Sequence, residues 1–277
     1  MSRFISLTSD FGAHSQGVGM MEGAVLSVCR DANIVHLAHD LPKYGIIAAA
    51  RAMESVRYFP TGNHVCVCDP GVGTSRRGLI CQVKRGDYLI GPDNGVLLPA
   101  ARMLGGIIDV HEIINSEYMR EPVSATFHGR DIFAPVAAHL ANGVQIAQFG
   151  PDVDPVTLIR APYGEAHRRA NSLEGKIIQI NGYGSINLNV THSQWEEFGV
   201  REGCEITVEL TEAHLLKIPV ARTYGDVPEG RAVIIKDDYG RVEIAKNLGS
   251  FANQYPVSIG DDVKITFDPD SRSGFLS

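Results

Sequence analysis

The stretch HVCVCDPGVGTSRR, residues 64–77, joins a buried-strand pattern to a charged turn. Its first five residues favour a strand, and the Asp-Pro-Gly sequence then ends that strand. The carboxylate of Asp69 therefore lies where the chain turns, and the guanidinium of Arg76 follows on the same loop. Charged side chains on loops at strand ends are a common way to build a proton-handling site.

Strand-like and helical patterns alternate on both sides of this stretch, up to about residue 160. This alternation predicts an α/β N-terminal domain, residues 1–165, with a largely parallel sheet. The expected strands are 4–7, 33–37, 64–68, 79–83 and 87–90, and the expected helices are 18–29, 45–58, 96–103 and 132–141.

The pattern changes after a polar, linker-like segment, residues 165–171. Short β runs separated by turn residues follow it, which predicts a smaller all-β barrel domain over residues 172–277. The expected strands of this domain are 175–180, 204–210, 232–236, 241–245 and 262–267.

Composition narrows the class of protein. A net charge of −7 and 44% hydrophobic residues describe a globular chain without the basic face of a general nucleic-acid binder. No apolar run reaches the roughly 18 residues of a membrane span, and the first residues lack the apolar core of a signal peptide. Five cysteines without a redox CxxC pair predict a reduced, cytoplasmic protein.

Three motifs have structural alternatives. The glycine-rich run 17–23 misses the dinucleotide fingerprint, and small-residue helix packing explains it better. His64, Cys66 and Cys68 alternate on one strand, where burial is a better explanation than a metal site. Asp10 follows the first strand, where it can accept hydrogen bonds from a ribose diol or form an Asx-turn or helix cap.

A second charged segment, TFHGRD, occupies residues 126–131, and a turn, GPDNG, occupies residues 91–95. Asp69, Arg76 and His128 can form a catalytic corner or a structural ion-pair network, and the residues alone leave both open.

These segments together closely resemble the S-adenosylmethionine hydroxide adenosyltransferases, the adenosine-forming S-adenosylmethionine hydrolases, which are related to the bacterial fluorinase and chlorinase. The resemblance rests on LTSDFG at 7–12, DPGVGT at 69–74 with Arg76, the segments 91–95 and 126–131, and YGRVEIAKN at 239–247. It implies the same two-domain fold and a homotrimer with its active site between subunits. It also implies a small adenosyl substrate, with water attacking C5′ of S-adenosylmethionine, and no cofactor, metal, nucleic acid or membrane.

The resemblance also implies residue roles. Asp69, Arg76 and His128 match the family's catalytic triad: Asp69 or His128 accepts or relays the proton of the attacking water, and Arg76 fixes Asp69. Gly129 stands where the fluorinase has a serine for halide, so the chain is similar to the water-using branch. The implied substrate-binding residues are Asp10, Tyr44, Thr74, Asn94, Phe127, Gly129, Asn181, Ser185, Asp238 and Asn247.

Three of these positions depart from the family pattern. Asn181 replaces an aspartate that binds the methionine amine, Ser185 an asparagine that reads adenine, and Asp238 a serine beside the methionine carboxylate. Losing one charged contact typically costs about 1.5–3 kcal/mol. Two alternatives therefore accompany S-adenosylmethionine hydrolysis: an adenosine-nucleoside binding protein with little catalysis, and a hydrolase of another 5′-substituted adenosine.

Overall fold

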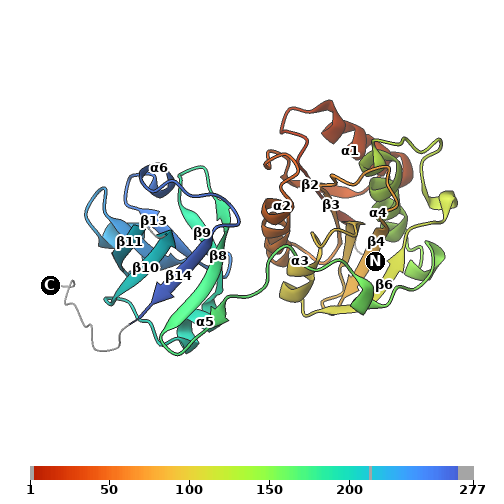
Figure 1. The fold of residues 1–277 in the computed structure, drawn as a ribbon. Coiled ribbons are helices and arrows are strands. Elements are labelled where there is room, and N and C mark those ends of the chain that lie inside the picture. The colour runs from red at the N-terminus through yellow and green to blue at the C-terminus, as the bar shows by residue number, and fades with distance from the viewer. Residues whose placement is uncertain (1–2, 212–213, 268–277) are drawn as a thin grey trace. The chain divides into compact units, whose positions relative to one another are not determined.

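A computed structural model describes residues 3–211 and 214–267, and its chain forms two compact units, Met1–Pro162 and Tyr163–Ser277 (Figure 1). Residues 268–277, the end of the predicted barrel domain, lie outside the described part.

The N-terminal unit is an α/β layer structure. Its strands are β1 (Phe4–Ser9), β2 (Asn33–Ala38), β3 (Asn63–Val67), β4 (Gly78–Val83), β5 (Tyr88–Pro92) and β6 (Ile107–Glu112). Its α-helices are α1 (Gln16–Val28), α2 (Ile46–Met53), α3 (Leu98–Met103) and α4 (Ala134–Ala141), with a short π-helix at Gly129–Phe133 directly before α4.

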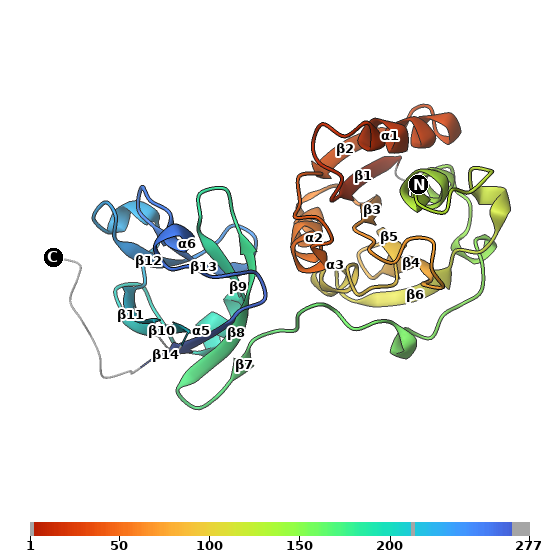
Figure 2. The ribbon, with the colours of Figure 1, turned by 45° about the horizontal axis from the view of Figure 1, so that its top comes forward.

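The six strands form one sheet in the order β2-β1-β3-β5-β4-β6. The pairs β1–β2, β1–β3 and β3–β5 are parallel, whereas β4 pairs antiparallel with both β5 and β6. The sheet is therefore mixed rather than largely parallel, because the short connection between β4 and β5 makes a hairpin. Figure 2 shows α1 with α4 on one face of the sheet and α2 with α3 on the other.

The C-terminal unit is a curled antiparallel sheet in the order β11-β10-β14-β8-β9-β13-β12 (Figure 2). Its end strands meet at a bridge between Val220 and Ile234, so the sheet is nearly closed. Trp195 and Phe251 join a buried aliphatic core inside it. The strands are β7 (His167–Arg168), β8 (Ser172–Ile180), β9 (Ile186–Thr191), β10 (Glu205–Thr211), β11 (His214–Pro219), β12 (Ala232–Lys236), β13 (Arg241–Lys246) and β14 (Asp262–Thr266), with helices α5 (His192–Glu197) and α6 (Phe251–Gln254).

Two local predictions need correction. The expected linker contains β7, which pairs with β8. Of the three glycines in the run 17–23, Gly17 packs closely against Phe11 and Phe127, whereas Gly19 and Gly23 face open space.

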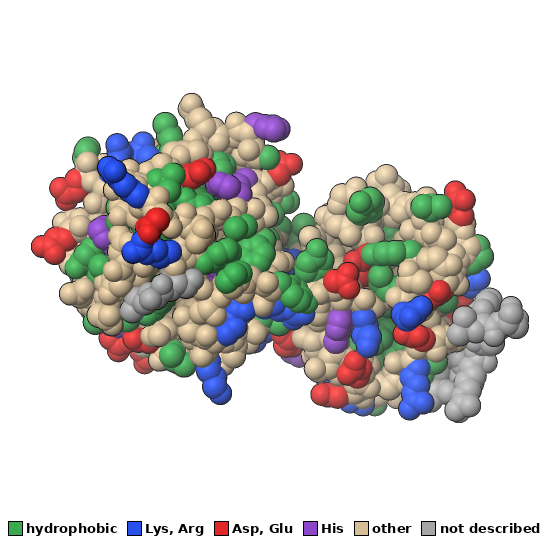
Figure 3. All heavy atoms as spheres, turned by 180° about the vertical axis from the view of Figure 1, so that it is seen from behind, with side chains coloured by type: hydrophobic (Ala, Val, Ile, Leu, Met, Phe, Trp, Pro, Cys, Tyr) green, Lys and Arg blue, Asp and Glu red, His purple; other side chains and the backbone are tan. Residues whose placement is uncertain are grey.

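Charged side chains of both signs are interspersed over the described residues on the face drawn in Figure 3. Among the described residues, no helix is long and apolar enough to cross a membrane.

Candidate active site

The site forms where the strand order of the N-terminal sheet reverses. The chain passes from β1 through α1 to β2 on one side, while β3 pairs with β1 on the other. Ligands of open α/β sheets bind at the carboxyl ends of strands at such a switch point. Asp10 directly follows β1, and Asp69 lies two residues after the end of β3, so the sequence delivers both carboxylates to this edge.

Asp69, Arg76 and His128 are in direct contact. Arg76 donates to Oδ2 of Asp69 from Nε at 2.9 Å and from Nη2 at 2.5 Å, and Nη2 also lies 2.6 Å from Nδ1 of His128. The guanidinium is stacked 5.2 Å from the ring centroid of Phe133. The structure therefore brings the three predicted catalytic residues together through one fixed guanidinium.

The contact with Arg76 fixes the hydrogen of His128. Because arginine can only donate, Nδ1 of His128 is the acceptor and the neutral ring carries its hydrogen on Nε2. Burial first, and the Arg76 charge second, lower the pKa of His128. His128 also lies directly before the π-helix, a distortion that is frequent at functional sites.

The other oxygen of Asp69 has no partner. The side chain is only 4% exposed, and Oδ1 is buried without a hydrogen bond from any described residue. An unpaired buried acceptor of this kind costs on the order of 1–3 kcal/mol. Asp69 therefore presents a free acceptor beside a cavity, held in direction by Arg76.

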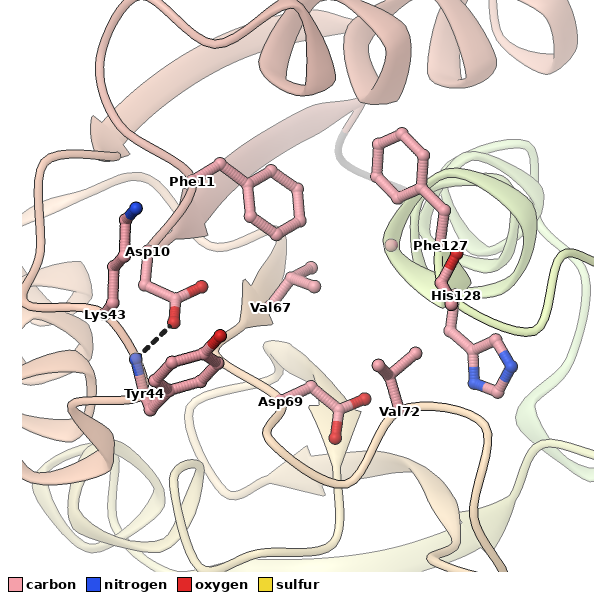
Figure 4. Close-up of a pocket in the computed structure, with 11 residues that line it drawn as sticks. Asp10, Phe11, Lys43, Tyr44, Val67, Asp69, Val72, Phe127 and His128 are labelled. Atoms are coloured by element: carbon pink, nitrogen blue, oxygen red, sulfur yellow. Dashed lines mark hydrogen bonds between the residues drawn. The ribbon is translucent and has the colours of Figure 1, made fainter.

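The cavity has a volume of about 280 Å³. Figure 4 shows Asp10 and Tyr44 on one side of it, and Asp69, Val72 and His128 on the other. The lining residues are Asp10, Phe11, Lys43, Tyr44, Val67, Asp69, Val72, Thr126, Phe127, His128 and Gly129.

Asp10 is held by the chain before α2. Its Oδ2 accepts from the backbone N–H of Tyr44 at 2.7 Å, whereas the cap of α1 is Ser15. The helix-cap alternative for Asp10 is thus wrong. Tyr44 itself has φ of 61° and a mostly exposed ring, a strained conformation for a non-glycine residue.

Phe127 and Gly129 also line the cavity. The ring of Phe127 meets that of Phe11 edge to face, with centroids 5.6 Å apart. A Cβ at Gly129 would lie 3.0 Å from both Sδ of Met21 and Cγ1 of Val67, so a side chain here requires these neighbours to shift.

Thr74 and Asn94 support the site without lining the cavity. The Thr74 hydroxyl donates to the Gly71 carbonyl at 2.6 Å, inside the loop that carries Arg76. Asn94 donates to the Cys68 carbonyl at 2.9 Å, next to Asp69. The loop also depends on Gly73, which has φ of 75° and whose Cβ position is occupied by the Ala125 carbonyl of the segment leading to His128.

The predicted residues of the C-terminal unit lie on turns. Oδ1 of Asn181 accepts from the backbone N–H groups of Tyr183 and Ser185, so this oxygen closes the turn between β8 and β9. Ser185 is buried, whereas Asp238 is exposed on the turn before β13. Asn247, after β13, donates to the Val227 carbonyl.

The other reactive groups of the N-terminal unit are structural or peripheral. His64 lies between Ser6 and Asp87, and all three are fully buried. Burial raises the pKa of the Cys66 thiol to about 12. Among the described residues, three metal-capable side chains gather only on the β6 side of the sheet, in a partly exposed cluster of Asp109, His111 and Asp152.

Sequence reasoning missed several lining residues. Lys43, Phe11, Val67, Val72 and Thr126 also face the cavity. Phe11, Val72 and Thr126 lie within the segments LTSDFG, DPGVGT and TFHGRD, respectively. Their position beside predicted site residues in these segments was the sequence signal that could have identified them.

Comparison with known proteins identifies the family. The family descriptions "SAM hydroxide adenosyltransferase N-terminal domain" and "C-terminal domain", where SAM is S-adenosylmethionine, match residues 5–150 and 175–264. The chain therefore belongs to the S-adenosylmethionine hydroxide adenosyltransferase family.

Individual relatives are similar to this chain over nearly its whole length. An (R)-S-adenosyl-L-methionine hydrolase of Salinispora tropica is 35% identical, covering 95% of this chain and 97% of the relative. A fluorinase of Nocardia brasiliensis is 25% identical, covering 94% and 96%. A crystal structure of a conserved protein from Thermotoga maritima has a TM-score of 0.89 at 28% identity, covering 95% of this chain and all of that one.

Proposed function

We propose that this protein hydrolyses S-adenosyl-L-methionine to adenosine and L-methionine. The observation that carries the proposal is the unpaired, buried Oδ1 of Asp69, a residue that lines the cavity and whose Oδ2 is held by Arg76. Family membership and the four similar hydrolases support the same reaction.

The proposed step is an in-line displacement at C5′. The water oxygen bonds to C5′ as the C5′–S bond breaks, and the electron pair leaves with sulfur as the neutral thioether of methionine. Asp69 Oδ1 accepts the water proton, because Nδ1 of His128 is occupied by Arg76. His128 orients the water through Nε2–H, and such general base catalysis contributes about 10²–10⁴ in rate. The sulfonium is already a good leaving group, so no cofactor is needed.

The substrate's remaining groups have partners in the proposal. Asp10 accepts hydrogen bonds from the ribose hydroxyls, and Tyr44, Phe127 and Gly129 line the adenosyl group. The name of the relatives specifies the (R) form of S-adenosyl-L-methionine. Since "L" describes the α-carbon, (R) describes the sulfonium centre, and we propose the same preference here.

The cavity of about 280 Å³ is slightly smaller than most ligand pockets, which span roughly 300–1,000 Å³. This size supports a site completed by the C-terminal unit of a neighbouring subunit in a homotrimer, with Asn181, Ser185, Asp238 and Asn247 facing the methionine and adenine ends. Light scattering tests the assembly: a monomeric mass for an active enzyme contradicts it. Free cysteines throughout the described chain support a cytoplasmic location.

The reaction is tested in ¹⁸O-labelled water with chromatographic detection of adenosine and methionine. Label is expected in the adenosine 5′-hydroxyl, and Asp69→Asn abolishes turnover. The matched control is Asp93→Asn, because Asp93 is held by Arg77 with almost the same geometry, 2.9 Å and 2.6 Å, but does not line the cavity. Equal activity of the two variants, or unlabelled adenosine, contradicts the proposal.

The altered positions favour one second candidate. Because Oδ1 of Asn181 is occupied by two backbone donors, it is not available to an amine. A 5′-substituted adenosine without the methionine amine therefore fits this turn better. Faster hydrolysis of such a compound than of S-adenosylmethionine establishes this alternative, and tight adenosine binding without any hydrolysis establishes a binding protein.

A further inference from the structure

A chain of hydrogen-bonded side chains runs from the surface of α1 to the base of the candidate site. Oε2 of Glu22 lies 3.2 Å from Nε2 of His36, and Nδ1 of His36 lies 2.8 Å from Nε2 of His39. Nδ1 of His39 then lies 2.7 Å from Oγ of Ser9. The outer members, Glu22 and His36, are partly exposed, whereas His39 and Ser9 are buried.

The carboxylate of Glu22, at the surface end, determines which atom donates in each of these hydrogen bonds. A carboxylate only accepts, so Nε2 of His36 donates to Glu22. In a neutral ring Nδ1 of His36 then accepts, and Nε2 of His39 donates to it. Nδ1 of His39 is left to accept from the hydroxyl of Ser9. With both rings neutral, all three bonds therefore point in one direction, from Ser9 to the surface.

The inner end of the chain holds the turn that carries Asp10. Ser9 precedes Asp10 directly, and its Oγ also faces the N–H of Phe11 at 3.5 Å. The N–H of Gly12 donates to the backbone carbonyl of His39 at 2.7 Å. His39 thus forms hydrogen bonds with both ends of the turn, through its ring at Ser9 and through its main-chain carbonyl at Gly12.

We propose that Ser9, His39, His36 and Glu22 form a positioning relay that sets Asp10 and Phe11 for the substrate, and that it holds them only in this hydrogen-bond direction. If the direction reverses, Nδ1–H of His39 donates to Ser9 together with the N–H of Phe11. The buried hydroxyl hydrogen of Ser9 then needs a new acceptor, and the turn must shift to provide one. The effect on substrate affinity rests on the proposed function.

Two substitutions at the surface end test the direction without touching the cavity. Glu22→Gln keeps an acceptor oxygen for His36, whereas Glu22→Lys offers only donors and reverses the chain. Glu22→Lys is expected to raise the KM for S-adenosylmethionine about tenfold with kcat changed less than about threefold, and Glu22→Gln to change KM less than about threefold. Equal KM values for the two variants, or a loss confined to kcat, overturn the proposal.

Nitrogen NMR of ¹⁵N-histidine protein gives a second readout that needs no turnover. At neutral pH, His39 is expected with its hydrogen on Nε2 in the wild type and in Glu22→Gln, and on Nδ1 in Glu22→Lys; His39→Gln assigns the signal. Hydrogen on Nδ1 in the wild type overturns the relay. Absence of hydrolysis by the wild type counts against the proposed function alone, and the tautomers still decide the relay.

Discussion

Acid should destabilise the N-terminal unit through His39. The side chain is 7% exposed, and burial, reinforced by the neighbouring His36, lowers the pKa of His39 to about 4 from 6.5. The folded state therefore resists a proton that the unfolded state binds. The stabilising contribution is complete above pH 6.5 and is lost progressively as the pH falls towards 4.

The magnitude follows from the shift. One pKa unit corresponds to about 1.4 kcal/mol, so the whole window is worth about 3 kcal/mol, of which about 2 kcal/mol is lost by pH 5. Other buried histidines, such as His64, also have lowered pKa values and add to the acid sensitivity. The contribution of His39 to the loss of stability in acid is isolated by comparing the wild type with His39→Gln.

Urea unfolding at pH 7 and pH 5, followed by far-ultraviolet circular dichroism, measures the difference. The wild type is expected to lose about 2 kcal/mol more than His39→Gln between these pH values. Trp195, the single tryptophan, lies in the C-terminal unit, so its fluorescence is an internal reference. His14→Gln, at an exposed histidine, should behave as the wild type. If the free energy of unfolding changes equally with pH in the wild type and in His39→Gln, the imidazole of His39 is not held neutral by burial.

Three further substitutions probe the cavity. Gly129→Ser places an atom against Met21 and is expected to destabilise the N-terminal unit by about 1–3 kcal/mol in urea unfolding; unchanged stability contradicts the tight fit. Arg76→Lys keeps the charge but loses the paired Nε and Nη2 donors that hold Asp69, so kcat in the adenosine assay should fall about tenfold to a hundredfold. An unaltered kcat excludes a role for this paired contact. Tyr44→Asn relieves the positive φ and should stabilise the fold by about 1 kcal/mol while raising KM; a destabilised variant shows that Tyr44 is not strained.

The strands that built the site were predictable because they are rich in apolar and β-branched residues and are bounded by turn signals. β1 and β3 are buried along almost their whole length, and turn signals follow each of them within a few residues. β9 was missed although Ile186–Thr191 alternates, because its polar members, Asn187 and Asn189, point into buried hydrogen bonds rather than to solvent. Strand direction was not predictable, since pairing depends on connections that the local pattern does not encode.

The sequence predicted which residues have side chains suited to the reaction, but not which of them are in contact. The contact between Arg76 and His128 joins positions 52 residues apart, and only the family resemblance suggested it. Thr74 and Asn94 are predicted to contact the substrate, and in the structure their side chains also hold the loop around Asp69. Their turn propensities were visible in the sequence and account for these contacts.

Three departures from the most stable arrangement lie around one cavity. Asp69 keeps a buried oxygen without a partner, Tyr44 holds a positive φ, and a π-helix interrupts the regular helix directly after His128. Elsewhere in the N-terminal unit the comparable group Asp93 is fully bonded, with Oδ2 on Arg77 and Oδ1 on the N–H of Ile159. The two carboxylates have nearly the same guanidinium geometry and differ in their second oxygen, which is bonded in Asp93 and has no partner in Asp69, the one of the two that lines the cavity. Since an unpaired acceptor lowers stability and is retained where it meets a ligand, this difference is the strongest structural reason to place the attacking water at Asp69.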